Sequence, residues 1–282
     1  MTVLLPSPAG PVPRIPSASH KPRRRVAIAV AALFVSAAAA ATEDPEIARR
    51  RAAERKVFTD AEIVDGFLKV TFGAEFPAAG RGDRDRIRKF DGPIRIFIDN
   101  HARPNRRNQV ASAIDDIRRR VQSLDMTVTE RRGDANMVVT LVRDRDLART
   151  IRSVYGSDRA LRIQRSLEPQ CLAGFSKDDK FRIVHANVIL VSDVGEFVFY
   201  DCVYEELLQA LGPINDDSSL PSSMFNDNVQ LGFFGIYDQY LLNLLYHPRI
   251  RPGMTRPQVQ AVLPEILPQV RAWVAEINGL PR

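Results

Sequence analysis

The stretch that decides the fold runs from Glu205 to Asn215 and reads EELLQALGPIN. It closes a helix predicted over residues 197–211, because Gly212 tolerates the positive φ that ends a helix and the proline after it prevents continuation. Glu205 and Gln209 are four residues apart, so their side chains lie about 40° apart around the helix axis. Two side chains with this spacing can hold one metal ion.

This stretch resembles the zinc-binding helix and turn of metzincin-type metallopeptidases. In those enzymes two histidines four residues apart bind zinc, a glutamate beside the first is the general base, and a glycine turns the chain toward a third ligand. Here Glu206 has the general-base position and Gly212 that of the glycine, whereas the histidine positions fall on Glu205, Gln209 and Asn215. The resemblance implies that Glu206 is the catalytic residue of any remaining activity.

Further landmarks follow in the same order. Met224 lies where the methionine turn of that family would follow, and a helix predicted over 237–246, with Asp238 and Tyr246, resembles its closing helix. A longer set of short matches resembles DUF2927, a bacterial family of unknown function: Cys202, Glu205-Glu206, Gln209, Leu211-Gly212, Asn215-Asp216, Phe225-Asn226-Asp227, Leu245-Tyr246 and Pro248. That resemblance implies a secreted or lipoprotein envelope protein with a degenerate metallopeptidase domain.

The pattern of apolar residues predicts the rest of the fold. Helical spacing predicts helices over 59–72 and 105–123, and short apolar runs predict strands over 94–98, 126–129, 137–142 and 181–191. The expected fold is an α+β, metzincin or zincin-like domain: a small twisted mixed sheet with a long helix before it and the former zinc helix after it.

The sequence also predicts the structure of two further segments and the division of the chain into four parts. Residues 144–170 are predicted to be a polar, helix-containing insertion, and the C-terminal tail is expected to form helical pieces broken by Pro264 and Pro268. The predicted parts are an export signal or signal anchor (1–41), a linker with an N-terminal helix (42–89), the zincin-like domain (90–250) and a C-terminal helical tail (251–282).

Each candidate site residue also has an ordinary structural interpretation. Glu205 and Glu206 resemble common surface acids of a helix, and Gln209 can hydrogen-bond within the domain. Asn215 begins a turn sequence, and Met224 is a residue that commonly fills a core. Only the ordered set favours the resemblance, which concerns ancestry and shape rather than activity.

The side chains at the three ligand positions argue against zinc. Zinc prefers imidazole or thiolate, so one carboxylate with two carboxamides would bind it poorly, and we expect no cofactor. Calcium is the alternative metal, because Glu205 and Asn215, with Asp216 or Asp227, supply the oxygen ligands that Ca²⁺ prefers. Metal-free hydrolysis by a carboxylate pair is a further alternative.

The N-terminal segment has the pattern of an export signal. Residues 1–41 contain five basic and no acidic residues, and a basic stretch precedes the apolar run 26–41. Cleavage would reduce the net charge of +6 by five, to +1, so the charge gives no indication of a nucleic-acid partner. We expect an exported protein, periplasmic or secreted, or anchored in the inner membrane through residues 26–41, which would be its only contact with a membrane.

The two cysteines, Cys171 and Cys202, both lie in the part expected to be exported. An even number of cysteines in an oxidising compartment favours a disulfide between them, and two unpaired buried thiols are the alternative.

Three functional hypotheses follow. The first is a non-catalytic binding module, whose former substrate cleft holds a peptide or cell-envelope component by strand addition. The second is a peptidase-like hydrolase that uses Glu206 with a non-zinc metal or with none. The third is a purely structural role in the envelope.

Overall fold

The computed structural model describes residues 43–72, 85–158, 160–161, 170–213 and 215–281. Residues Glu43–Arg282 form one compact unit. The expected export signal lies outside the described residues. Among the helices that the structure describes, none is both long and apolar enough to span a bilayer.

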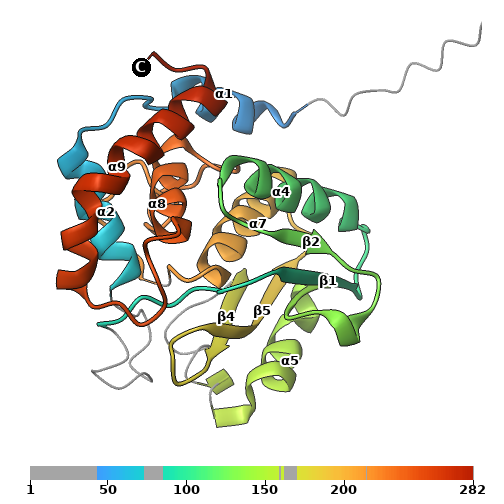
Figure 1. The fold of residues 1–282 in the computed structure, drawn as a ribbon. Helices are drawn as coiled ribbons and strands as arrows, with labels where there is room; N and C mark the ends of the chain where they lie inside the picture. The colour runs from blue at the N-terminus through green and yellow to red at the C-terminus, as the bar shows by residue number, and fades with distance from the viewer. Residues whose placement is uncertain (1–42, 73–84, 159, 162–169, 214, 282) are drawn as a thin grey trace, which may run out of the picture. The chain divides into compact units, whose positions relative to one another are not determined.

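The centre of the unit is a five-stranded mixed sheet with strand order β2-β1-β3-β5-β4 (Figure 1). The first four strands in this order are parallel, and β4 is antiparallel to β5 at one edge. Their bounds are β1 Ile94–Asn100, β2 Met126–Val128, β3 Met137–Val142, β4 Cys171–Lys177 and β5 Ile183–Val191. The α+β class and the mixed sheet are confirmed.

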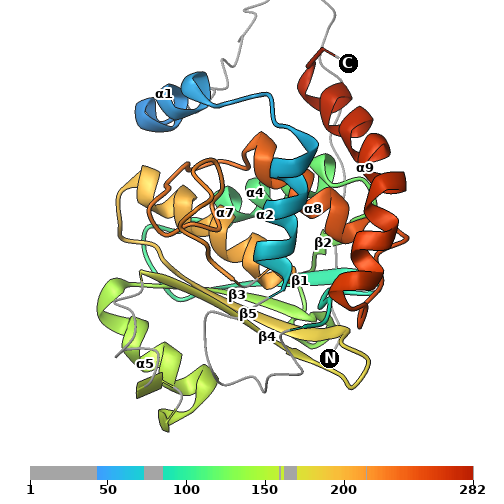
Figure 2. The ribbon, with the colours of Figure 1, turned by 90° about the vertical axis from the view of Figure 1, so that its left-hand side faces the viewer.

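Helices cover both faces of this sheet (Figure 2). On one face, α4 (Arg107–Arg120) packs on β1 and β2, and α7 (Glu196–Ala210) packs on β4 and β5. On the other face, α5 (Asp144–Tyr155) packs on β3 and β5. The α7 face holds the main apolar core, and the α5 face holds a smaller one around Val142 and Ile189.

A further layer of helices packs beside α7. It contains α2 (Asp60–Thr71), α8 (Ile236–Tyr246) and α9 (Arg256–Asn278), which contact one another, and a short α1 (Pro45–Ala53) precedes them. Helix α2 begins at a capping box in which the Thr59 hydroxyl accepts a hydrogen bond from the Glu62 amide and the Glu62 carboxylate accepts one from the Thr59 amide. The predicted helix over 59–72 is confirmed.

The prediction missed one strand, β4. The sequence of this strand, CLAGFSK, fully buries only Leu172, and Gly174 lowers its β propensity. Strand β4 forms because β5 offers it a partner and α7 covers part of one face. The predicted succession β, α, β, β, β was therefore incomplete, and the polar insertion leads into this edge strand.

The prediction of a broken C-terminal tail was wrong, because α9 is one helix that contains both Pro264 and Pro268. The two prolines are four residues apart and exposed, so the backbone carbonyls that they leave without an amide partner face solvent. The opposite stripe, which includes Leu263, Leu267 and Val270, is buried against the neighbouring helices. That burial offsets the two lost backbone hydrogen bonds.

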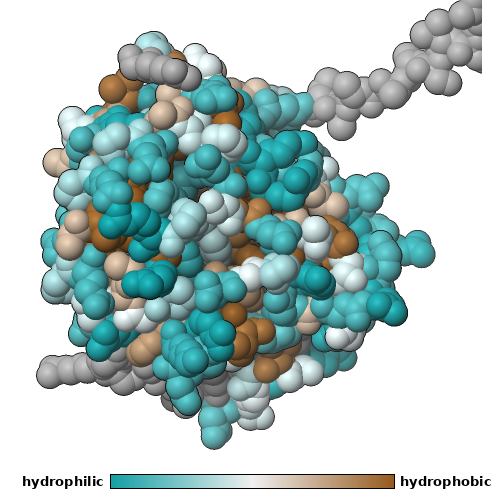
Figure 3. Space-filling model, in the orientation of Figure 1, coloured by the Kyte–Doolittle hydropathy of each residue, from teal (hydrophilic) through white to brown (hydrophobic). Residues whose placement is uncertain are grey.

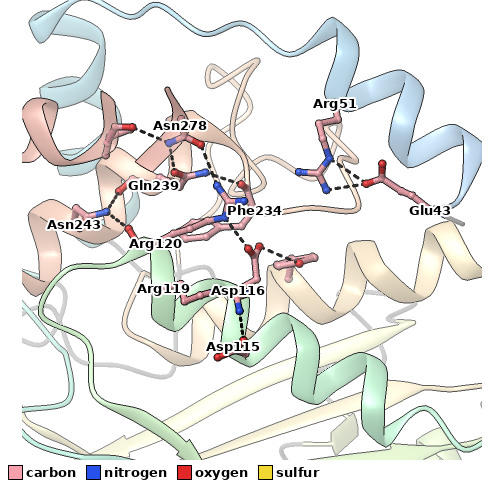
Figure 4. Close-up of polar contacts among 12 residues, drawn as sticks. Glu43, Arg51, Asp115, Asp116, Arg119, Arg120, Phe234, Gln239, Asn243 and Asn278 are labelled. Carbon is pink, nitrogen blue, oxygen red and sulfur yellow. Dashed lines mark hydrogen bonds and ion pairs between the residues drawn. The ribbon is translucent and has the colours of Figure 1, made fainter. Parts of the chain in front are cut away.

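Polar side chains join α4 to α8 and α9 (Figure 4). The backbone oxygen of Arg120 accepts hydrogen bonds from Asn243 Nδ2 at 2.8 Å and from Trp273 Nε1 at 3.0 Å. The Arg120 side chain donates to Asn278 Oδ1 at 3.0 Å, and Asn278 Nδ2 donates to Gln239 Oε1 at 2.7 Å. The C-terminal end of α4 is thus satisfied by side chains from two other helices.

The face of the molecule shown in Figure 3 is mostly hydrophilic, and its apolar residues occur in small separate areas. The arginines at the end of α4 are paired with acids, Arg118 with Asp115 at 2.7 Å and Arg120 with Asp116 at 2.7 Å.

Candidate functional site

The candidate site lies at the C-terminal half of α7. Cys202 on this helix forms a disulfide with Cys171, the first residue of β4, with a Cα–Cα distance of 5.8 Å. The predicted disulfide is confirmed. Glu205 follows Cys202 by less than one helical turn, so the covalent link fixes the edge strand next to the residues of the site.

The end of α7 requires glycine. Gly212 has φ +136°, and a Cβ atom at this position would lie 2.2 Å from the backbone oxygen of Arg88. The hydroxyl of Tyr246, at the end of α8, donates a 2.8 Å hydrogen bond to the Leu211 oxygen. The tyrosine satisfies a terminal carbonyl of α7 and fixes the turn that follows.

Three carboxylates converge beside this turn. One oxygen from each of Glu205, Asp216 and Asp227 lies within 4.8 Å of the others. Gln209 Nε2 donates to the Asp216 carboxylate at 3.3 Å, so the first two former ligand positions meet at Asp216. Burial and the nearby Asp227 charge raise the pKa of Asp216 to about 7, although the hydrogen bond from Gln209 acts in the opposite direction.

The amide nitrogen of the third ligand position binds outside this cluster. Asn215 Nδ2 donates a 3.0 Å hydrogen bond to the backbone oxygen of Lys69 at the end of α2. Asp216, the next residue, contributes a carboxylate oxygen to the cluster. Glu206 is buried, with 5% of its surface exposed, and adjacent helix positions such as Glu205 and Glu206 point about 100° apart.

The turn around Met224 is organised by a buried carboxylate. Asp238 on α8 accepts a 2.5 Å hydrogen bond from Ser223 Oγ and a 2.9 Å hydrogen bond from the Met224 amide. Ser223 Oγ in turn accepts a 3.1 Å hydrogen bond from the Phe225 amide. Full burial raises the pKa of Asp238 to about 7, while the two hydrogen bonds oppose the shift and the charge of Glu54 adds to it.

Ser223 and Glu54 were not among the residues singled out from the sequence. The Glu54 carboxylate accepts a hydrogen bond from the Ile236 amide at the first turn of α8, where the helix dipole favours a negative charge. Because Glu54 is distant in sequence, no local pattern could have indicated this contact. Ser223 had a weak signal, its position immediately before the methionine.

The ligand atoms of the cluster do not fit zinc. They are carboxylate oxygens with a carboxamide beside them, and the nearby Cys202 sulfur is in the disulfide. Zinc sites in proteins are built mainly from imidazole and thiolate. Three carboxylates at this separation fit a hard cation such as Ca²⁺. Among the described residues, they form the one group of three His, Cys, Asp or Glu side chains placed closely enough to hold an ion.

Comparison with known families agrees with the landmarks around α7. The family model described as "Protein of unknown function (DUF2927)" matches residues 60–265, most of the chain. The chain belongs to the DUF2927 family. The DUF2927 match includes the whole sheet, α7 and α8, and its description assigns no reaction. No curated protein matches the chain.

Proposed function

We propose that this DUF2927 protein is an exported envelope protein whose domain is metzincin-like, has lost zinc chemistry and serves as a binding module. The observation that carries the proposal is the composition of the site: Glu205, Gln209 and Asn215 stand where histidines would bind zinc. The surrounding frame favours common ancestry, since Gly212 ends the helix and Met224 lies in a turn fixed from α8.

The proposed ligand is an extended peptide or a peptide-like cell-envelope component that adds to the sheet beside β4. Among the described strands, β4 pairs only with β5 and so forms one edge of the sheet, the position at which strand addition takes place. The Cys171–Cys202 disulfide holds this edge against α7 and reduces the entropy lost on binding, because the strand is already ordered.

Export is supported by the same disulfide. Such bonds persist in oxidising compartments such as the periplasm or the extracellular space and are rare in the cytosol. The basic and apolar pattern of residues 1–41 points in the same direction.

The proposal is tested by selecting extended peptides from a displayed library on the purified, oxidised protein. We expect binders whose affinity falls when their backbone is N-methylated, since strand addition depends on main-chain hydrogen bonds. Glu206→Gln should leave their affinity unchanged. Failure to select any peptide, or selection of peptides that tolerate N-methylation, would contradict the proposal.

The alternative function is a peptidase-like hydrolase that uses Glu206 with a hard cation. It is favoured by the convergence of Glu205, Asp216 and Asp227 within 4.8 Å. Elemental analysis, with melting curves in Zn²⁺, Ca²⁺ and Mg²⁺, separates the two functions, because a bound ion raises the melting temperature. Cleavage of peptides by the wild type that is lost in a folded Glu206→Gln variant would establish the hydrolase and refute the non-catalytic module.

A further inference from the structure

The opposite face of the sheet contains a pocket, separate from the carboxylate cluster at α7. It has a volume of about 490 Å³ and lies beside α5, which packs on the face that α4 and α7 leave uncovered (Figure 2). Its floor includes Asp99 of β1 and Thr140 of β3, which are register partners in the sheet. The pocket is therefore built on the carboxyl ends of two adjacent parallel strands.

The connections of these two strands diverge. Strand β1 leads through α4 on one face to β2, whereas β3 leads through α5 on the other face toward β4 and β5. In open α/β sheets, a crevice forms where neighbouring strands lead to opposite faces, and ligands commonly bind at their carboxyl ends. The topology alone thus makes this position a candidate ligand site.

The carboxylates of the pocket are less exposed to solvent than its guanidinium groups. The Asp99 and Asp146 side chains are 21% and 19% exposed, whereas Arg132 and Arg149 are 60% and 75% exposed. Asp99 pairs with Arg132, and Asp146 pairs with both Arg149 and Arg143. The inner carboxylates hold the guanidinium groups in position at the rim of the pocket.

The three arginines retain hydrogen-bonding capacity. Each guanidinium has five N–H donors, and one nitrogen atom each of Arg132, Arg143 and Arg149 donates to these carboxylates. Three arginines against two carboxylates give the lining a formal charge of +1 with its histidine neutral. Fixed guanidinium forks of this kind match carboxylate and phosphate groups.

Hydroxyl groups form part of the remaining lining. They belong to Thr140, Thr150 and Ser153, and His101 and two valines complete the wall. Hydroxyl groups can both donate and accept hydrogen bonds, as sugar hydroxyls do. The volume is in the range of small-molecule sites.

We infer that this pocket between β1, β3 and α5 binds an oxyanion group carried by a small hydroxylated molecule, namely a sugar phosphate or a uronic acid. The guanidinium groups of Arg132, Arg143 and Arg149 receive the anion, and the hydroxyls of the wall contact the sugar.

The test is calorimetric titration of the purified protein at low ionic strength with glucose 6-phosphate, glucuronate and, as the uncharged comparison, glucose. We expect saturable binding of at least one acid and none of glucose, and the acid that binds distinguishes phosphate from carboxylate. Arg149→Gln should weaken binding at least about tenfold, since it removes a charged hydrogen-bonding group. Because the Arg149 side chain is 75% exposed, this substitution should leave the fold intact.

Two further variants make the test specific. Thr150→Glu should abolish binding by placing a carboxylate in the pocket. Arg118→Gln is the matched control, because Arg118 on α4 pairs with Asp115 at the same i,i+3 spacing but lies outside the pocket. Absence of saturable binding of both acids up to about 10 mM, or equal weakening by Arg149→Gln and Arg118→Gln, would overturn the inference.

Discussion

Removal of the Cys171–Cys202 disulfide should destabilise the folded protein strongly. The two cysteines are separated by 31 residues, and in the chain-entropy model a loop of this length corresponds to about 3.7 kcal/mol at 25 °C. Replacing the buried Cys202 by alanine adds a small loss of packing. For a domain of this size, the sum corresponds to a fall in melting temperature of roughly 7–15 °C.

The assay is urea unfolding of the Cys171→Ala/Cys202→Ala variant and of the wild type. Fluorescence of Trp273, the single tryptophan, reports on α9, and circular dichroism reports on the whole fold. Without the cross-link the unfolded chain is more expanded, so the dependence of the unfolding free energy on urea should also steepen. Wild type unfolded in a reducing agent is the control for the cross-link alone.

Two results would refute this reasoning. A loss below about 1 kcal/mol would mean that the cross-link does not restrict the unfolded chain as the loop length requires. A loss in the double variant without a similar loss in the reduced wild type would assign the effect to packing around Cys202 instead.

Three other substitutions test contacts that hold the helices of the domain in place. Gly212→Ala should cost at least about 3 kcal/mol in unfolding free energy, because the new Cβ would lie 2.2 Å from the Arg88 oxygen. Gly92→Ala is the control, and it should change the unfolding free energy by less than about 0.5 kcal/mol because a Cβ there would meet nothing within 4 Å. Similar losses in the two variants would contradict the requirement for glycine at position 212. The pKa of Asp238 is raised from 3.8 to about 7, so its contribution to stability is complete below pH 3.8 and is lost as the pH rises through 7. Melting curves from pH 4 to 8 should therefore show a smaller decline for Asp238→Asn than for wild type, and parallel declines would exclude this group as the cause. Asn243→Ala removes three hydrogen bonds of 2.8–2.9 Å to backbone groups and should cost about 2–4 kcal/mol in urea unfolding, with a loss under about 1 kcal/mol as the contrary result.

Much of the fold could be predicted from local sequence, where one physical signal dominates. Strand β3 was predicted with its observed bounds, because a continuous apolar run suits a strand buried on both faces. Helices α7 and α8 were predicted from apolar content and from the Gly and Pro residues that end them. Strand β4 and the continuity of α9 could not be predicted this way, since both depend on neighbours distant in sequence.

Only part of the candidate site, like only part of the fold, could be predicted from the sequence. Helix geometry places Glu205 and Gln209 on one face, as expected from their spacing. The approach of Asp216 and Asp227 depends on the path of two turns, which have no apolar periodicity to fix them. The link between Ser223 and Asp238 joins two segments through a buried carboxylate, and such contacts require the tertiary structure.

Helix α9 has a practical consequence for choosing chain boundaries. The family match ends at residue 265, in the middle of this helix, yet Val270 and Val274 beyond it are buried and Trp273 and Asn278 are bonded to α4 and α8. A recombinant fragment trimmed to the matched region would lack the second half of α9 and would expose the apolar side of α8 to solvent. The unit that must be expressed intact is therefore longer than the unit that sequence similarity delineates.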